Sequence, residues 1–202
     1  MKIFCIGRNY VDHIQELNNE LPEHMVMFMK PSTALHFNND PWYIPTFSND
    51  IHYECEIVLK ICKNGKYIQP AFADSYFEEI SLGIDFTARD IQTKQKEKGL
   101  PWEIAKAFDH SAVVGHFMSK SNFDMNQIHF EMLQNERVVQ KGNSAMMIYS
   151  FQTIICELSK YFTLQKGDLI YTGTPAGVGR VASDDILKGI LASQEVFSLQ
   201  IK

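Results

Sequence analysis

The sequence predicts a mainly β domain of the α+β class, and three observations carry this prediction. The chain has 202 residues, of which 45% are hydrophobic and 21% charged, as in a globular domain with a substantial core. Many short apolar segments rich in β-branched residues alternate with turn residues, whereas few segments have the periodicity of a helix. No repeat or linker divides the chain, so we expect a single domain over residues 1–202.

The expected strands are distributed along the whole chain. The clearest one begins with two glutamates and continues as "IVLKIC", an apolar run that is typical of a buried strand. In order, the expected strands cover residues 2–6, 24–29, 54–62, 79–84, 113–117, 127–133, 137–140, 168–171 and 196–201.

Three segments are expected to form helices. The first, "YVDHIQELNNELP", has an apolar stripe of Val11, Ile14 and Leu17. The second, "ARDIQTKQKEK", follows Thr87, which we expect to cap it together with the residue three positions on, Asp90. The third, "SFQTIICELSKYF", has an apolar face and begins at a capping serine.

Composition excludes several classes of partner. The formal net charge of −5 does not favour nucleic acid or an anionic membrane surface. The longest apolar stretch, "AMMIYSFQTIIC", is too short to span a bilayer. The four cysteines form no C-x-x-C pair, and "MKIFCIGRNY" has no features of a secretory signal. We therefore expect a cytoplasmic protein with reduced cysteines and no nucleic-acid or membrane partner.

Two glutamates lie one residue apart in "HYECE", at the start of the most apolar strand. Alternate strand residues share a face, so His52, Glu54 and Glu56 are expected on one side, with the glutamates about 7 Å apart. Near the core, such a pair is costly unless a cation lies between the carboxylates. Asp85, at the end of another strand, could provide a third ligand for Mg²⁺ or Mn²⁺. The alternative is a solvated strand face, which the spacing alone favours.

The same stretch also permits a different metal centre. "HYE" matches the His-x-Glu half of a two-histidine, one-carboxylate iron site, with His110, His116 or His129 as the second histidine. Such a site would make the protein a non-haem iron oxygenase. The signal is weak, because seven histidines make one such pairing common by chance.

Other segments offer groups for catalysis or binding. His13 and Glu16, three residues apart on a helix, could form a general base with an orienting carboxylate, or could lie on an exposed flank. Lys106, in the apolar context "GLPWEIAKAFD", could hold a substrate carboxylate or pair with an acidic residue. The glycine-rich segment "YTGTPAGVG" could direct backbone N–H groups and the Thr174 hydroxyl at an oxyanion, or could form an ordinary turn.

Six motifs, taken in order, resemble the fumarylacetoacetate hydrolase family, in particular its short, single-domain acylpyruvase-like branch. They extend over nearly the whole chain and read "GRNYVDHIQE", "FMKPSTA", "HYECEIVL", "GIDFTARDIQ", "KGLPWEIAKAFD" and "YTGTPAGVG". The resemblance implies a mixed β-roll or sandwich with short flanking helices, and a homodimer. It also reverses the preference for a solvated strand face, because the matching carboxylates of the family bind Mg²⁺ or Mn²⁺.

The resemblance further implies a role for each group of candidate residues. It makes Glu54, Glu56 and Asp85 the metal ligands. His13 and Glu16 would form a catalytic dyad on a mobile lid within residues 1–22, where they would activate a water molecule. The remaining groups would contact substrate or lie beside it, with Lys106 also acting in catalysis: Lys30, Arg89, Gln92, Lys106 and Thr174.

The function expected from these motifs is divalent-metal-dependent hydrolysis or decarboxylation at a C–C bond. The substrates would be small 2-oxo or 2,4-dioxo acids of the acylpyruvate, fumarylpyruvate or oxaloacetate type, in which a metal ion stabilises an enolate. One alternative is an isomerase or tautomerase of diacids such as 2-hydroxyhepta-2,4-diene-1,7-dioate. Two alternatives of other classes are the iron oxygenase and a metal-binding protein without catalytic activity.

Overall fold

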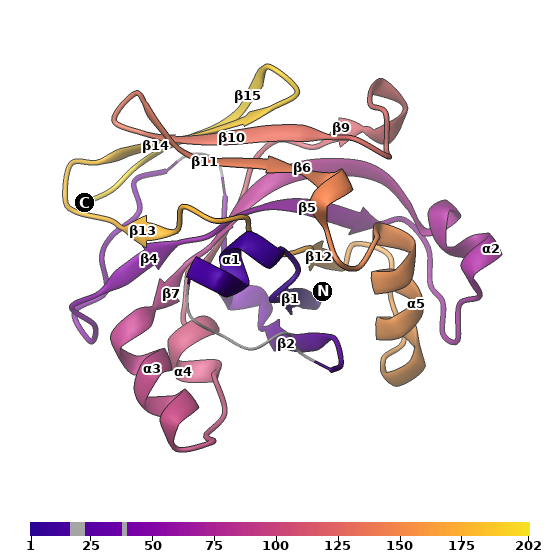
Figure 1. Ribbon diagram of the computed structural model, residues 1–202, viewed down its shortest axis with the longest axis horizontal. Helices are drawn as coiled ribbons and strands as arrows, with labels where there is room; N and C mark the ends of the chain where they lie inside the picture. The colour runs from indigo at the N-terminus through magenta and orange to yellow at the C-terminus, as the bar shows by residue number, and fades with distance from the viewer. Residues whose placement is uncertain (17–22, 38–39) are drawn as a thin grey trace.

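The computed structural model describes residues 1–16, 23–37 and 40–202, and its fold is built mainly from three β-sheets. Figure 1 shows a four-stranded sheet lying above the long strands β5 (Cys55–Ile61) and β6 (Phe77–Asp85) of the largest sheet. The sheets are curled and short helices flank them. The predicted fold class, mainly β with flanking helices, is therefore confirmed.

The largest sheet has eight strands, in the order β2-β1-β12-β5-β6-β8-β3, with β9 also paired to β6. β5 lies inside this sheet and is buried over most of its length, which explains its run of apolar β-branched residues. Two of the pairings, β1 with β12 and β3 with β8, are parallel. The other strands are β1 (Ile3–Gly7), β2 (Val26–Lys30), β3 (Leu35–His36), β8 (Ala112–Val114), β9 (Met118–Ser119) and β12 (Leu169–Tyr171).

The four-stranded sheet consists of two hairpins joined side by side in the order β11-β10-β14-β15. Each hairpin turns through two residues with positive φ, 51° and 65° in the first and 46° and 70° in the second. Two-residue turns of this kind match the twist of antiparallel strands. The four strands are β10 (His129–Gln134), β11 (Arg137–Asn143), β14 (Ile186–Leu191) and β15 (Gln194–Gln200), and the third sheet joins β13 (Gly179–Arg180), β4 (Ile51–Tyr53) and β7 (Thr87–Ala88).

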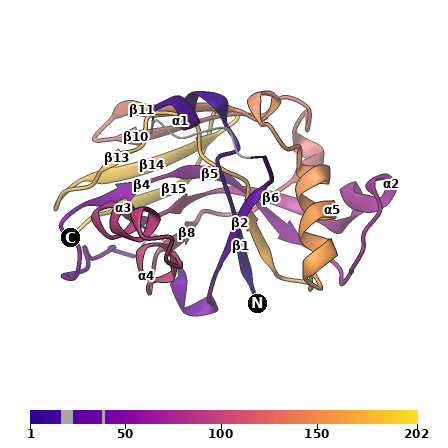
Figure 2. The ribbon, with the colours of Figure 1, turned by 60° about the horizontal axis from the view of Figure 1, so that its bottom comes forward.

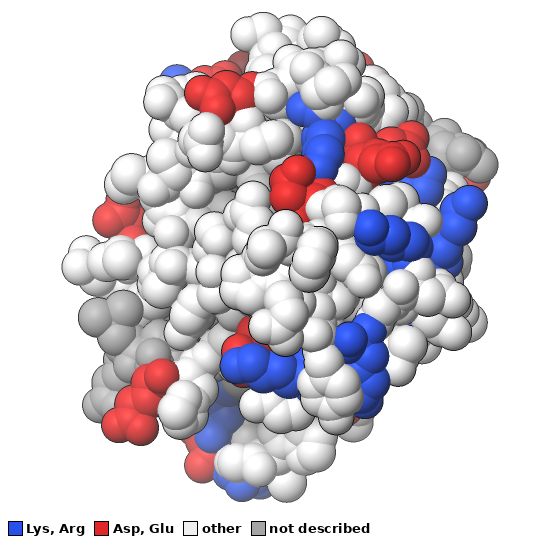
Figure 3. Space-filling model, turned by 90° about the vertical axis from the view of Figure 1, so that its right-hand side faces the viewer, with Lys and Arg blue, Asp and Glu red and all other residues white. Residues whose placement is uncertain are grey.

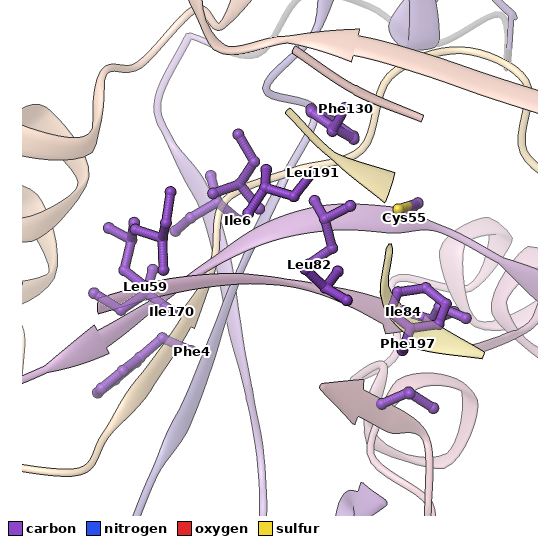
Figure 4. Packing of buried hydrophobic residues seen from close by; sticks show 14 of the residues in the cluster. Phe4, Ile6, Cys55, Leu59, Leu82, Ile84, Phe130, Ile170, Leu191 and Phe197 are labelled. Carbon is purple, nitrogen blue, oxygen red and sulfur yellow. The ribbon is translucent and has the colours of Figure 1, made fainter. Parts of the chain in front are cut away.

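The main hydrophobic core lies between the four-stranded sheet and the strands beneath it. Figure 4 shows Leu82 and Ile84 of β6 close to Leu191 and Phe197 of the four-stranded sheet, which we call the upper sheet, and all four side chains are buried. Gly189 makes this packing possible, because a Cβ atom there would lie 2.2 Å from the ring of Phe197. The upper sheet is thus held over β6 by apolar contact, which leaves the ends of β5 and β6 available for polar side chains.

The helices are short and flank the sheets. Figure 2 shows α3 and α4 on one side of β1 and β2, with α5 on the other. α5 buries Phe151, Ile154, Ile155 and Leu158, the apolar face that its sequence predicts. The five α-helices that the described part of the chain contains are α1 (Val11–Glu16), α2 (Pro70–Ala73), α3 (Arg89–Glu97), α4 (Glu103–Lys106) and α5 (Phe151–Tyr161).

Two further features of the molecule are the charge on one face and the character of its helices. The face that carries α2 and α5 presents acidic and basic side chains mixed among uncharged ones (Figure 3). Among the described residues, no helix combines the length and the apolar character that crossing a bilayer requires.

One predicted helix cap is correct and the other is wrong. The Ser150 hydroxyl accepts a hydrogen bond from the backbone N–H of Thr153 at 3.2 Å, so Ser150 caps α5 as expected. Thr87, in contrast, lies in β7 and pairs with β4, which keeps its backbone extended; Ala88 precedes α3 and provides no side-chain cap. The carboxylate of Asp90 instead accepts hydrogen bonds from residues outside the helix, including the Ser48 hydroxyl at 2.6 Å.

The strand β14 differs from the prediction, and the end of the first predicted helix lies outside the described residues. α1 ends at Glu16 in the described part of the chain, and Leu17, which we expected in its apolar stripe, lies outside the described residues. β14 is absent from the predicted strands because "ILKGIL" contains a glycine and is followed by Ala192 and Ser193, which are unusual in a two-residue turn.

Loss of the α5 cap should reduce stability by about 1 kcal/mol, because Ser150→Ala leaves an N–H at the helix start without its acceptor. Urea denaturation at pH 7 would measure the change. Ser183→Ala, in an exposed turn, is the control and should change the free energy of unfolding by less than about 0.5 kcal/mol. Equal stability of the two variants would contradict the assigned cap.

Candidate active site

Three buried carboxylates meet where β5 begins and β6 ends. Glu54 lies between β4 and β5, Glu56 lies in β5, and Asp85 is the last residue of β6. The antiparallel pairing of β5 with β6 brings them together, and the Asp85 N–H donates to the Glu54 carbonyl oxygen at 2.8 Å. One oxygen from each carboxylate lies within 4.8 Å of the other two, and the residues are only 6%, 2% and 1% exposed. The geometry therefore brings together the three predicted metal ligands.

Basic side chains balance the negative charge of two of these carboxylates. The Lys106 ammonium group, at the end of α4, donates to Glu54 Oε2 at 2.6 Å and to Asp85 Oδ2 at 2.8 Å. Burial alone would raise the pKa of Glu54, but Lys106 and Arg89 outweigh it and hold this pKa well below its usual range. Burial alone would lower the pKa of Lys106, but the negative charges of Asp85 and Glu54 outweigh it and raise this pKa. Lys106 thus pairs with acidic residues, one of the two roles that its sequence context allowed.

Glu56 has a different environment from the other two carboxylates. Its Oε2 accepts a hydrogen bond from the Gly173 N–H at 2.6 Å, and no described Lys or Arg nitrogen forms an ion pair with it. Burial, followed by the negative charges of Asp85 and Glu54, raises the pKa of Glu56 well above its usual value. A further positive charge would relieve this repulsion. Three convergent carboxylates are also a donor set that suits Mg²⁺ or Mn²⁺.

The structure does not bring His52 into this group. The strand expected at 54–62 begins at Cys55, and His52 belongs to β4 in another sheet, so the face expected to continue from His52 to Glu56 is interrupted. The His52 Nε2 atom lies 3.0 Å from Asp50 Oδ1. Among the described residues, the group with metal-ligand geometry contains no histidine, and the iron site based on "HYE" is therefore not assembled.

His13 and Glu16 form the expected pair on α1. Their side chains approach to 3.2 Å between His13 Nδ1 and Glu16 Oε2, and Glu16 Oε1 also accepts the Gly177 N–H at 2.9 Å. His13 is buried, so it does not lie on an exposed helix flank, whereas Glu16 remains exposed. The second hydrogen bond ties the end of α1 to the glycine-rich segment, which orients the pair.

The carboxylates and His13 line one small cavity of about 40 Å³. A larger, mostly apolar groove of about 560 Å³ lies beside it and shares Phe28 and Trp102 with it, but contains none of the three carboxylates. We assign the candidate site to the smaller cavity, because its side chains carry the chemistry. Its lining residues are Ile6, Gly7, Arg8, His13, Phe28, Glu54, Glu56, Asp85, Arg89, Gln92, Lys96, Trp102, Lys106 and Thr174.

The predicted substrate-contacting residues occupy different positions. Arg89, Gln92 and Thr174 line the cavity, and the Arg89 guanidinium donates to Gln92 Oε1 at 2.6 Å. Lys30 is not among the lining residues. Its ammonium group lies 2.7 Å from Asp85 Oδ1 and donates to the Ser111 hydroxyl at 3.0 Å, so it supports the carboxylates from behind.

Sequence reasoning missed two basic residues of the cavity, Arg8 and Lys96. Arg8 directly follows β1 and has a φ of 59°, a left-handed conformation that is uncommon for arginine. Lys96 lies seven residues after Arg89 and four after Gln92 on α3, a spacing that places all three on one helix face. This spacing was the available signal for Lys96.

Removal of the Lys106 charge should strongly destabilise the protein. In Lys106→Met, two buried carboxylates lose their shared ammonium partner, for an expected loss of about 3–5 kcal/mol in the free energy of unfolding. Chemical denaturation in the presence of a chelator would measure it. The control is Lys60→Met, which breaks a solvent-exposed pair with Glu79 and should cost less than about 1 kcal/mol. Similar losses in both variants would argue against the buried network.

The family is shown by comparison with known proteins. The model of the family described as fumarylacetoacetate (FAA) hydrolase C-terminal matches residues 2–199. Oxaloacetate tautomerase FAHD1, mitochondrial, of Bos taurus is 39% identical over 190 residues, covering 93% of this chain and 86% of its own. Oxaloacetate decarboxylase, mitochondrial, of Dictyostelium discoideum is 38% identical over 189 residues, covering 93% of this chain and 87% of its own.

The fold agrees with that of solved structures from the same family. Fumarylpyruvate hydrolase from Pseudomonas aeruginosa, solved in complex with Mn²⁺ and pyruvate, superposes with a TM-score of 0.93 at 30% sequence identity. The match covers 100% of this chain and 89% of that one. The matched region includes the three convergent carboxylates and the pair on α1. This chain is a member of the fumarylacetoacetate hydrolase family.

Proposed function

We propose that this protein is a divalent-metal-dependent enzyme that interconverts the keto and enol forms of a 2-oxo diacid of the oxaloacetate type. The observation that carries the proposal is the convergence of three buried carboxylates and Lys106 in a cavity that also contains His13. The name of the Bos taurus relative supports tautomerisation in particular. The sequence alone offered a tautomerase only as an alternative, for diacids such as 2-hydroxyhepta-2,4-diene-1,7-dioate; the name of this relative moves tautomerisation ahead of C–C bond cleavage and oxaloacetate ahead of those diacids.

In this proposal, Glu54, Glu56 and Asp85 hold Mg²⁺ or Mn²⁺. Their oxygen donors and the raised pKa of Glu56 fit a divalent cation, and the Mn²⁺ complex of the Pseudomonas aeruginosa protein supports the same class of ion. When bound, the ion would polarise the 2-oxo carbonyl group and supply positive charge where enolate charge develops.

The chain's own side chains would move the proton. With Glu16 accepting from Nδ1 of His13, Nε2 is the ring nitrogen that remains to act as a base. His13 would take a proton from the carbon beside the 2-oxo group and would then deliver it to the resulting enolate oxygen, which completes the enol. Lys106 would offset the negative charge during this transfer, and Arg89, Gln92 and Thr174 would contact the substrate.

C–C bond hydrolysis is the second candidate, and the His13–Glu16 pair favours it. The same base could deprotonate a water molecule that attacks the distal carbonyl of an acylpyruvate or fumarylpyruvate. The Pseudomonas aeruginosa hydrolase supports this reaction, and the Dictyostelium discoideum relative supports decarboxylation. All three reactions pass through an enolate, so one site can serve any of them.

The broader organisation is also part of the proposal. We propose a single catalytic domain over residues 1–202 that assembles as a homodimer and has a mobile lid helix within residues 1–22. α1 is the described part of this lid, whereas residues 17–22 lie outside the described residues. A cytoplasmic location stays a prediction, because two of the relatives compared above are named as mitochondrial.

Loss of a proposed metal ligand should abolish metal-dependent turnover. We expect Glu54→Gln to lower the rate of oxaloacetate tautomerisation with Mg²⁺ or Mn²⁺ by more than about 100-fold, beyond the 10–100-fold typical of groups that only orient a ligand. Absorbance of the enol would follow the reaction, and calorimetry would follow Mn²⁺ binding. Glu79→Gln, an exposed carboxylate on β6, is the control and should retain both. Unchanged turnover in Glu54→Gln would refute the metal assignment.

Loss of His13 should separate proton transfer from metal binding. We expect His13→Ala to lower turnover by about 10²–10⁴-fold while the affinity for Mn²⁺ stays within a few-fold. NMR would follow deuterium exchange beside the 2-oxo group of oxaloacetate and, separately, cleavage of acetylpyruvate. Gln15→Ala, on the exposed side of α1, is the matched control.

The wild-type protein in this experiment also distinguishes the two candidate reactions. Exchange without cleavage products would support the tautomerase, whereas rapid cleavage of acetylpyruvate would support the hydrolase. Full activity of His13→Ala in both assays would exclude His13 as the base.

A further inference from the structure

A glutamine outside the cavity connects the two backbone segments that carry the site. Gln140, on β11 of the four-stranded sheet, is only 1% exposed. Its Oε1 accepts the Cys55 N–H at 2.9 Å, and its Nε2 donates to Thr174 Oγ1 at 2.8 Å and to the Pro175 carbonyl oxygen at 2.9 Å. A backbone donor on one side and a carbonyl acceptor on the other fix which way the amide points.

The hydrogen bond from the Cys55 N–H to Gln140 holds the residue that lies between Glu54 and Glu56. β12 ends at Tyr171 and pairs only with residues 58–60 of β5, so Cys55 has no strand partner on that side. Gln140 satisfies its N–H group, and the Thr174 hydroxyl donates to its carbonyl oxygen at 2.9 Å. Both polar groups of Cys55 are thus tied to this network, and rotation of its peptide planes would change the direction of both glutamates.

The other contacts hold the segment that follows β12. Gly173 donates its N–H to Glu56 Oε2 at 2.6 Å, and its φ of 104° suits glycine. Gln140 holds the next two residues in place through its Nε2 atom. The segment also lies directly on β11, since a Cβ atom at Gly177 would be 2.2 Å from the Val139 carbonyl oxygen. The position of the Gly173 N–H relative to Glu56 therefore depends on the hydrogen bonds of Gln140 and on the contact of Gly177 with β11.

We propose that Gln140 is a positioning residue for the active site. By joining Cys55 to residues 174 and 175, it sets the direction of Glu54 and Glu56 relative to the Gly173 N–H, although it does not itself line the cavity. In this role the upper sheet, through one side chain, preorganises the carboxylates that the proposed function assigns to the metal ion. The inference rests on that function for its consequence in catalysis, but its geometric part stands without it.

The test compares Gln140→Leu with Gln134→Leu. Gln134 is a matched control on the adjacent strand β10, where its amide also makes three hydrogen bonds, with Tyr53, Arg180 and Asp185. These contacts do not involve the three carboxylates. For both variants, NMR would measure amide hydrogen exchange at Cys55 and Gly173 without added metal, calorimetry would measure Mn²⁺ affinity, and kinetics would give kcat and KM separately.

We expect Gln140→Leu to exchange the Cys55 and Gly173 amides at least about 10-fold faster and to bind Mn²⁺ about 10–100-fold more weakly, with a fall in kcat that exceeds the change in KM. Gln134→Leu should stay within about 2-fold in all three measurements, even with a comparable loss of thermal stability. Gln140→Glu keeps an acceptor for Cys55 but loses the Nε2 donors, and serves in the same assays where the leucine variant does not fold.

Two results would overturn the proposal. One is unchanged exchange at Cys55 and Gly173 in the Gln140 variants. The other is a loss of Mn²⁺ affinity and kcat that is the same in the Gln134 control. A wild-type protein that neither binds Mn²⁺ nor converts any 2-oxo acid would refute the proposed function instead, and amide exchange would still decide whether Gln140 positions these segments.

Discussion

The arrangement of residues around the site depends on the ion pairs that the Lys106 ammonium group forms with both Glu54 and Asp85. Glu54 and Asp85 are buried, and each would carry a large desolvation cost without a cation in contact. Lys106 reaches both because α4 packs against α3 and against β7, the strand that follows β6, and Lys30 reaches Asp85 from the end of β2. The ends of β2 and β6 in the large sheet thus bring opposite charges together.

Much of this site could be predicted from the sequence, because the informative residues belong to short motifs whose spacing is local. Glu54 and Glu56 are one residue apart and His13 and Glu16 are three apart, so secondary structure alone brings the members of each pair together. Asp85 could be named as a third ligand from its place at the end of a strand, but its pairing with the segment of Glu54 is a tertiary feature, and only the family resemblance made the three-carboxylate site the preferred interpretation. The location of Lys30 behind Asp85 is a tertiary feature with no local signal.

The same distinction explains what was missed in the fold. α5 was predicted with its cap because its apolar face and Ser150 are both local features. Thr87 was assigned to a helix cap because its neighbours suit one, but pairing with β4 determines its conformation. β14 has an unremarkable sequence with a central glycine, and the reason for that glycine is the ring of Phe197 on the next strand. Gln140 resembles any polar residue of an exposed hairpin until its three partners are known.

The parallel pairing of β1 with β12 has a consequence for synthesis on the ribosome. Ile3 pairs with Leu169, so β1 cannot complete its parallel pairing until β12, which is translated much later, is available. At about 5–20 residues per second, that interval is on the order of ten to thirty seconds. α1 follows β1 directly, and Glu16 is held by Gly177, which is translated later still. One edge of the apolar strand β1 therefore stays without its partner during most of the synthesis of the domain, although β2 can pair with the other edge early.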